Sequence, residues 1–191
     1  MFNIEQLFPQ PILNGKMPDW GICQAELMSI ITANLESDLD IPEDFVNNKF
    51  ICRNILDKCT ITRTYIQEFL DQYATSIGIN PITIEDSWIT AYKKKEFIVP
   101  HNHLPKFVSG VLFIKQPKSG GKFYFDNPVQ NIDNIGQHRN YTEEKNFTER
   151  AHVIEPEEGQ VIVFKSFMIH GTTQVISDDQ RFTLAFNAKF V

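Results

Sequence analysis

The alternation of apolar and polar residues near the end of the chain constrains its fold more than any other feature. In an extended strand, successive side chains point to opposite faces. The run that begins at residue 181 divides into an aromatic face, made of Phe182, Leu184, Phe186 and Phe190, and a polar face, made of Arg181, Thr183, Ala185 and Asn187. The run is therefore predicted to be a strand with two different faces. It overlaps the end of a longer stretch, residues 159–187, in which apolar residues alternate before and after a turn.

The two faces of this strand require different neighbours. The aromatic face requires a hydrophobic cover. The polar face can line a closed barrel only if Arg181 meets an anion, because burying an unpaired guanidinium is very unfavourable. That anion is a carboxylate of the protein or of a ligand, and the Thr183 hydroxyl on the same face is placed to share it.

The first part of the chain shows helical periodicity. A helix is predicted over residues 63–77, because Ile66, Phe69, Leu70, Tyr73 and Ile77 form one stripe and Gly78 follows as a stop. Leu27, Ile30, Ile31 and Leu35 recur at the same spacing. We therefore expect residues 1–82 to form a mostly helical support, after a short opening strand within residues 2–8.

From residue 83 onward the apolar period changes to two. Short strands are predicted over residues 84–91, 107–115 and 122–125, and Gly110 marks a bulge or a close backbone approach. The polar segment 129–151 lacks periodicity, and a lid and a surface excursion both remain open for it. The sequence thus predicts one α+β, mainly β domain over 1–191, with a β core over 83–191.

Composition excludes some classes of partner. A formal net charge of −6 disfavours nucleic acid and anionic membranes as partners. We expect no signal peptide, and no apolar run is long enough to span a bilayer. The three cysteines show no CxxC pairing, which fits a reducing compartment. We therefore expect a cytoplasmic protein and leave a homodimer open.

Candidate metal ligands lie between the predicted strands. His101 and His103 share a face if this segment is extended, so both imidazoles can bind one ion, and imidazole suits iron, zinc, copper and nickel. Such a pair alone is a weak signal. It gains weight because His170 precedes Gly171 at the end of another predicted strand and Arg181 follows soon after.

The order of the motifs resembles the iron(II)/2-oxoglutarate-dependent dioxygenases, specifically a subgroup found in bacteria and their phages. The matching segments cover residues 86–190 and read HNH, SGVLF, GGKFYFDNP, GQVIVFKSFMIHG and RFTLAFN. This resemblance implies a double-stranded β-helix, which is also called a jelly roll and is cupin-like. The order of the predicted elements places the N-terminal helices on one of its sheets.

The resemblance also implies roles for individual residues. His101 and His170 match the metal ligands, Arg181 matches the clamp for the far carboxylate of 2-oxoglutarate, and Thr183 matches its helper. The cofactor would be Fe(II), and a small molecule or a side chain would be hydroxylated while 2-oxoglutarate yields succinate and carbon dioxide. Further polar groups that could line the pocket, or else serve as ordinary core or surface groups, are Tyr92, Ser109, Tyr124 and Asn187.

One position departs from the wider family, which has Asp or Glu where this chain has His103. His103 can replace the carboxylate and give a three-histidine site. Asp126 can instead supply the carboxylate from a neighbouring strand, although a turn-capping role before Asn127 also fits it. In the third reading, the metal is not iron.

Two other functions remain open. A cupin-like three-histidine metalloenzyme would not use 2-oxoglutarate, but typical cupins have a glutamate shortly after HxH, and residues 104–109 contain none. A non-catalytic jelly-roll binding module would retain the histidines without chemistry. Arg181 and Thr183 separate these alternatives, because only a 2-oxoglutarate enzyme needs such a clamp inside the barrel.

Overall fold

The computed structural model describes residues 9–36, 49–128 and 151–191 of this chain. In these ranges the helices are α1 (Trp20–Glu36), the short 3-10 helix η1 (Ile55–Lys58) and α2 (Thr60–Ile77). The strands are β1 (Leu13–Lys16), β2 (Lys49–Arg53), β3 (Ile82–Tyr92), β4 (Val108–Lys115), β5 (Phe123–Asp126), β6 (Ala151–Ile154), β7 (Gln160–Lys165), β8 (His170–Thr172) and β9 (Arg181–Phe190).

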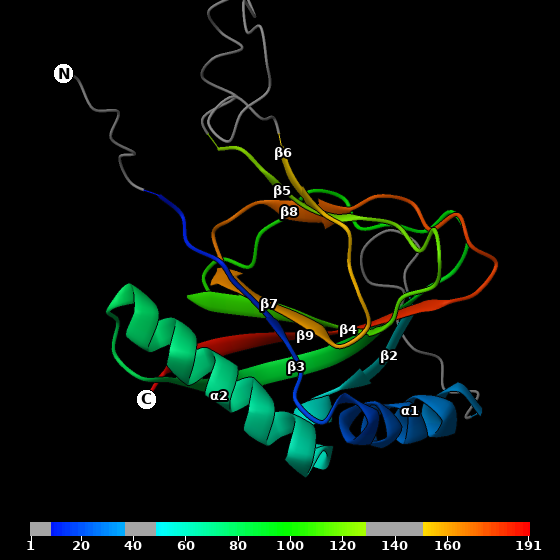
Figure 1. Cartoon of the computed structure of the whole chain (residues 1–191), viewed down its shortest axis with the longest axis horizontal. Coiled ribbons are helices and arrows are strands. Elements are labelled where there is room, and N and C mark those ends of the chain that lie inside the picture. The colour runs from blue at the N-terminus through cyan, green and yellow to red at the C-terminus, as the bar shows by residue number, and fades with distance from the viewer. Residues whose placement is uncertain (1–8, 37–48, 129–150) are drawn as a thin grey trace, which may run out of the picture.

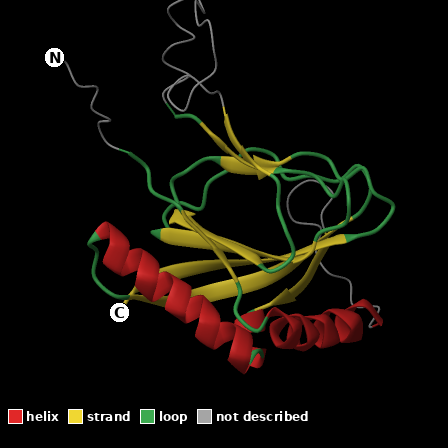
Figure 2. Ribbon diagram, in the orientation of Figure 1, coloured by secondary structure: helices red, strands yellow, loops and turns green. Residues whose placement is uncertain are grey.

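Two antiparallel sheets face each other (Figure 1). The larger sheet has six strands in the order β1-β7-β4-β9-β3-β2, and the smaller has three in the order β6-β5-β8. From β4 onward, β4, β7 and β9 belong to the larger sheet, whereas β5, β6 and β8 form the smaller one. Helices α1 and α2 cover the outer face of the larger sheet (Figure 2). The predicted α+β, mainly β jelly roll with helices packed on one sheet is therefore confirmed.

Helix α2 confirms the helix expected from the apolar stripe. Ile66, Leu70 and Tyr73 are buried, and Gly78 ends the helix with a φ of 70°, a conformation that glycine adopts without steric cost. The helix begins at Thr60, three residues before the predicted start at residue 63. In the described part of the chain, neither long helix is apolar enough over a sufficient length to cross a membrane.

The aromatic face of β9 packs beneath these helices, as its pattern predicted. Phe182, Leu184 and Phe186 are buried in one cluster with residues of α1 and α2, and burying each such side chain contributes about 1.5–3 kcal/mol. Phe190 differs, because it is 45% exposed and packs against Phe107. Gly110 allows a close approach, since a Cβ there would lie 2.2 Å from Cζ of Phe186.

The N-terminal part is less helical than expected. Strands β1 and β2 form the two edges of the larger sheet, where β1 pairs with β7 and β2 pairs with β3. Their pairing partners lie far away in the sequence, so local periodicity gave little sign of them. The expected opening strand lies outside the described residues. The expected lid over 129–151 also does, except for Ala151, which begins β6.

The polar face of β9 points into the space between the sheets. Its register with β3 places polar side chains of the two strands opposite one another, in the pairs Tyr92↔Arg181, Thr90↔Thr183 and Asp86↔Asn187. A second apolar cluster, which contains Phe113, Phe123 and Phe164, lies between the same sheets. The inner face of the larger sheet therefore presents a row of polar groups within an otherwise apolar interior.

Candidate metal centre

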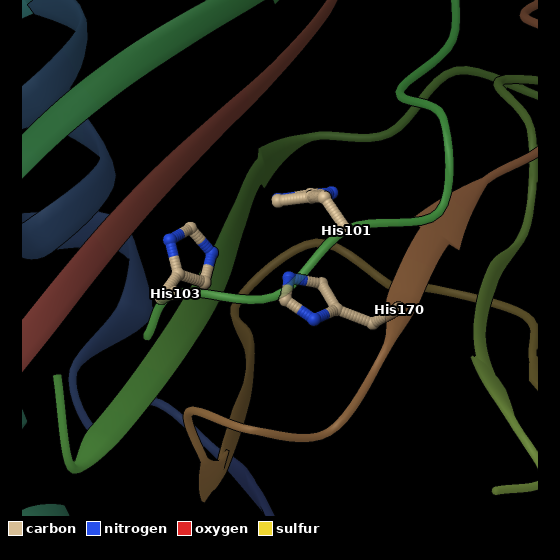
Figure 3. Close-up of side chains that lie close together, drawn as sticks. All are labelled: His101, His103 and His170. Carbon is tan, nitrogen blue, oxygen red and sulfur yellow. The ribbon is translucent and has the colours of Figure 1, made fainter. Parts of the chain in front are cut away.

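Three histidines converge at the open end of this interior. His101 and His103 lie on the loop between β3 and β4, and His170 begins β8 (Figure 3). One ring nitrogen from each lies within 4.8 Å of the others. His101 and His170 are held together by an isolated β-bridge, in which each backbone N–H donates to the other residue's carbonyl at 3.0 and 2.9 Å. The structure thus joins two segments that are far apart in the sequence.

Two of the three rings are oriented by their own backbone. Nδ1 of His101 lies 2.9 Å from the carbonyl oxygen of Val99, and Nδ1 of His170 lies 2.9 Å from that of Met168. Since a carbonyl oxygen can only accept, each Nδ1 carries a proton, and in the neutral form of the ring Nε2 keeps a free lone pair. That is the arrangement in which a neutral imidazole binds a metal.

Burial keeps His103 and His170 neutral. Desolvation, with a smaller contribution from the nearby His101, lowers the pKa of His170 to about 3. Desolvation also lowers the pKa of His103 to about 4, with His101 adding to the effect and Asp86 opposing it. Neutral imidazoles near neutral pH are the form that metal binding requires.

The histidines border a cavity of about 340 Å³. This volume lies in the range of small-molecule pockets. The wall is mainly apolar, and its polar or aromatic members outside the histidines include Arg53, Trp88, Thr90, Tyr92, Asn102, Thr172 and Thr183. Trp88 lies beside the three histidines, with its ring centroid 5.8 Å from that of His103.

Arg181 lies directly behind the wall of this cavity and is fully buried. Its guanidinium carbon lies 3.8 Å from the ring centroid of Tyr92, Nη1 donates to the Gly120 carbonyl at 3.0 Å, and Nη2 donates to the Thr172 hydroxyl at 3.2 Å. Nε has no hydrogen-bond partner, and among the described residues no carboxylate pairs with the guanidinium. A buried cation of this kind indicates a site for an external anion.

Two of the expected pocket residues contact this arginine or each other. Tyr92 stacks on Arg181, and the Thr183 hydroxyl lies 3.5 Å from the Tyr92 hydroxyl. Both residues line the cavity. No direct hydrogen bond joins Thr183 to Arg181 among the described contacts. Thr172 makes that contact instead.

The other expected pocket residues lie elsewhere. Ser109 and Asn187 face inward but are buried in a hydrogen-bonded chain at the far end of β9 and do not line the cavity. Tyr124 and Asp126 point away from the interior, because they alternate with Phe123 and Phe125, whose rings contact His170. Asp126 is accordingly outside the cluster that could hold a metal, so the structure does not support it as the alternative ligand.

The sequence reasoning missed two parts of the arginine site. Thr172 shares a face of β8 with His170, and the spacing of two residues could have indicated it. The loop at Gly120 and Gly121 covers the guanidinium, and a Cβ at Gly121 would lie 3.2 Å from Nη1 and 2.5 Å from the Thr173 carbonyl. The paired glycines before residue 122 were a visible signal of this close approach.

The part of the sequence that carries this site matches a known protein family. Residues 86–187, more than half of the 191-residue chain, match the family model described as "Putative 2OG-Fe(II) oxygenase". The chain belongs to this family of 2OG-Fe(II) oxygenases. It is therefore an oxidoreductase whose cofactor is Fe(II) and whose co-substrate is 2-oxoglutarate. No curated protein matches the sequence significantly.

Solved structures of the same fold include enzymes with these cofactors. The carbocyclase SnoK from nogalamycin biosynthesis, described as non-heme and alpha ketoglutarate dependent, is 12% identical, with 95% of this chain and 80% of that chain covered and a TM-score of 0.65. A Pseudomonas putida prolyl-4-hydroxylase is 12% identical, with coverage of 95% and 94% and a TM-score of 0.63. The epimerase SnoN in complex with Fe3+, alpha ketoglutarate and nogalamycin RO is 10% identical, with coverage of 95% and 79% and a TM-score of 0.66. At these identities the likeness concerns the fold alone.

The residues of this 2OG-Fe(II) oxygenase fit its cofactors. Nitrogen ligands suit Fe(II), and a buried guanidinium with an unsatisfied Nε suits a dicarboxylate. The family match does not favour the cupin-like alternative without 2-oxoglutarate or the non-catalytic binding module.

Proposed function

We propose that this 2OG-Fe(II) oxygenase hydroxylates a small molecule or an exposed side chain, with release of succinate and carbon dioxide. In this proposal His101, His103 and His170 are the metal ligands, and Arg181 binds the far carboxylate of 2-oxoglutarate. The observation that carries the proposal is the pairing of two features in one interior: three converging imidazoles and, behind the cavity wall, a buried cation without a carboxylate partner among the described residues.

His103 takes the position where the wider family has a carboxylate. Its ring lies 4.9 Å from that of His101 and 5.1 Å from that of His170, centroid to centroid, so it belongs to the same cluster. Asp126 points the other way, which leaves His103 as the ligand that the geometry supports. When bound, the iron would supply the oxidising chemistry, and the protein orients the reactants and excludes water.

Arg181 provides charge and direction for the co-substrate. A carboxylate that reaches the guanidinium would satisfy the free Nε and would share the Thr172 hydroxyl with Nη2. Tyr92 holds the guanidinium plane by stacking. The apolar wall, which includes Phe113 and Phe164, keeps water from this ion pair and strengthens it.

Anaerobic titration of the full chain with Fe(II) and 2-oxoglutarate tests the proposal. We expect a visible charge-transfer band in the wild-type protein, no band and no tight iron binding in His170→Ala, and an unchanged fold by circular dichroism. His152→Ala is the matched control, because His152 is an exposed histidine of the same small sheet. Succinate release in the presence of candidate substrates then identifies the substrate class.

Either of two results would remove the proposal. Stoichiometric iron binding by His170→Ala would refute its ligand role. A wild-type protein that binds Fe(II) but gives no band with 2-oxoglutarate would refute the use of this cavity for the co-substrate.

A further inference from the structure

The backbone of His103 is one member of a closed ring of hydrogen bonds that also contains one ion pair. Its N–H donates to the Ser166 carbonyl at 2.9 Å, and its carbonyl accepts from the Lys106 N–H at 2.8 Å. Both polar groups of the His103 peptide backbone are therefore occupied. The two partners come from different elements, since Ser166 follows β7 and Lys106 precedes β4.

The side chains of the same two partners are connected by a second path. The Ser109 hydroxyl donates to Oδ1 of Asn187 at 2.7 Å, so its single proton is used and the Ser166 hydroxyl must donate to Ser109, also at 2.7 Å. Nδ2 of Asn187 donates to Oδ1 of Asp86 at 2.7 Å. Nζ of Lys106 lies 3.4 Å from Oδ2 of Asp86, which completes the ring.

The ring extends from the buried interior to the protein surface. Ser109, Ser166 and Asn187 are at most 4% exposed, while the side chains of Asp86 and Lys106 are 35% and 30% exposed. All donors along the buried path point toward the Asp86 carboxylate. Hydrogen bonds aligned in this way polarise one another, and a charged acceptor at the end strengthens them.

His103 needs such support more than the other two histidines. His101 and His170 have rings fixed by hydrogen bonds to Val99 and Met168. Among the described contacts, the His103 ring has no hydrogen bond and touches only rings: Trp88 and the other two imidazoles. Its direction therefore depends on the position of its backbone.

We propose that Asp86 is a positioning residue for the metal centre, which anchors the hydrogen-bonded ring and thereby holds His103 against the other two ligands. The inference rests on the proposed role of His103 as a ligand. Asp86 does not line the cavity, and among the described contacts no hydrogen bond or ion pair joins it directly to the three histidines. It acts through Asn187, Ser109 and Ser166 on one side and through Lys106 on the other.

Titration of the full, metal-free chain with Co(II) tests this inference without requiring activity, because the visible bands of Co(II) report its coordination. We expect Asp86→Asn to bind Co(II) about 10- to 100-fold more weakly, with shifted bands, as is typical when an outer-shell partner is removed. Asp178→Asn is the matched control, since this carboxylate pairs with Lys94 on the surface, far from the ring. It should bind Co(II) like the wild type.

A double-mutant cycle separates positioning from general destabilisation. If Asp86 acts through His103, then Asp86→Asn should cause no further loss of Co(II) affinity in the His103→Ala background. Ser109→Ala breaks the same ring at a neutral position and should reproduce the weakening, so the inference stays testable if Asp86→Asn does not fold.

Three outcomes would overturn the inference. The first is wild-type Co(II) affinity in both ring variants, and the second is fully additive losses in the cycle. The third is wild-type Co(II) affinity in His103→Ala, which would remove His103 as a ligand. That third result would leave iron and 2-oxoglutarate use, tested separately by the charge-transfer band, standing on His101 and His170.

Discussion

The two ends of the polar face of β9 differ in whether their polar groups have partners. At one end, Arg181 is fully buried with a free Nε and without a carboxylate partner among the described residues. At the other end, roughly 20 Å along the strand, Asn187 uses both its oxygen and its nitrogen, and Asp86 has a partner on each carboxylate oxygen. One end of β9 thus carries a cation without a carboxylate partner, while the other end donates to an anion of the neighbouring strand β3 whose oxygens are both paired.

This difference distinguishes a ligand site from a scaffold. A buried polar group left without a partner is unfavourable, so a protein that retains one keeps it for a group that arrives later. A buried group whose hydrogen bonds are complete already contributes to the folded state. We therefore expect substitutions at the Arg181 end to change 2-oxoglutarate binding, and substitutions at the Asn187 end to change stability and, through His103, metal affinity, but not 2-oxoglutarate binding to the metal-loaded protein.

The largest effect is expected at Arg181. Arg181→Ala should weaken 2-oxoglutarate binding to the Fe(II)-loaded protein by roughly 3–5 kcal/mol, because the ligand carboxylate would be buried without its partner. Unfolding of the metal-free protein in urea should be unchanged or occur at higher denaturant, since an unpaired buried cation is removed. Calorimetry gives the affinity, and Arg63→Ala, which breaks a surface ion pair with Asp57, is the control. Unchanged affinity together with a large loss of stability would reverse the assignment of this end.

Asn187→Ala should have a smaller and different effect. The substitution leaves the Ser109 hydroxyl proton without its acceptor and one Asp86 oxygen without its donor, which lowers the free energy of unfolding by roughly 1–3 kcal/mol. Affinity for 2-oxoglutarate at saturating Fe(II) should remain within about twofold. Urea unfolding of the metal-free protein measures the first quantity, with Gln160→Ala, which removes a solvent-facing hydrogen bond to Asn14, as the control. A stable variant with weakened 2-oxoglutarate binding would contradict the comparison.

The smallest effect concerns the hydroxyl beside Arg181. Thr172→Val removes the acceptor for Nη2 and should reduce 2-oxoglutarate affinity by about 0.5–1.5 kcal/mol, the usual contribution of one hydrogen bond. Thr183→Val should reduce it less, because Thr183 contacts the Tyr92 hydroxyl rather than the guanidinium. Calorimetry on the two variants in parallel checks this order. A larger loss in Thr183→Val would restore Thr183 as the helper of the clamp.

The sequence predicted the inward arginine because strand alternation is local. Once residues 181–190 are extended, the aromatic residues must share one face and Arg181 must point the other way. The helix that ends at Gly78 was predictable for the same reason. Contacts between distant segments were not, so the edge strands β1 and β2 were missed, and the sequence left open whether Ser109, Tyr124 and Asn187 line the pocket or serve as core or surface groups.

The sequence by itself determined which side chains share a face, since that follows from the backbone geometry of each strand. It also supplied the imidazoles of His101 and His103 on one short segment. Only the tertiary structure decided that His170 meets them, that Thr172 rather than Thr183 contacts Arg181, and that Asp86 pairs with Asn187. Those contacts depend on strand order and register, which are fixed by packing over the whole sheet.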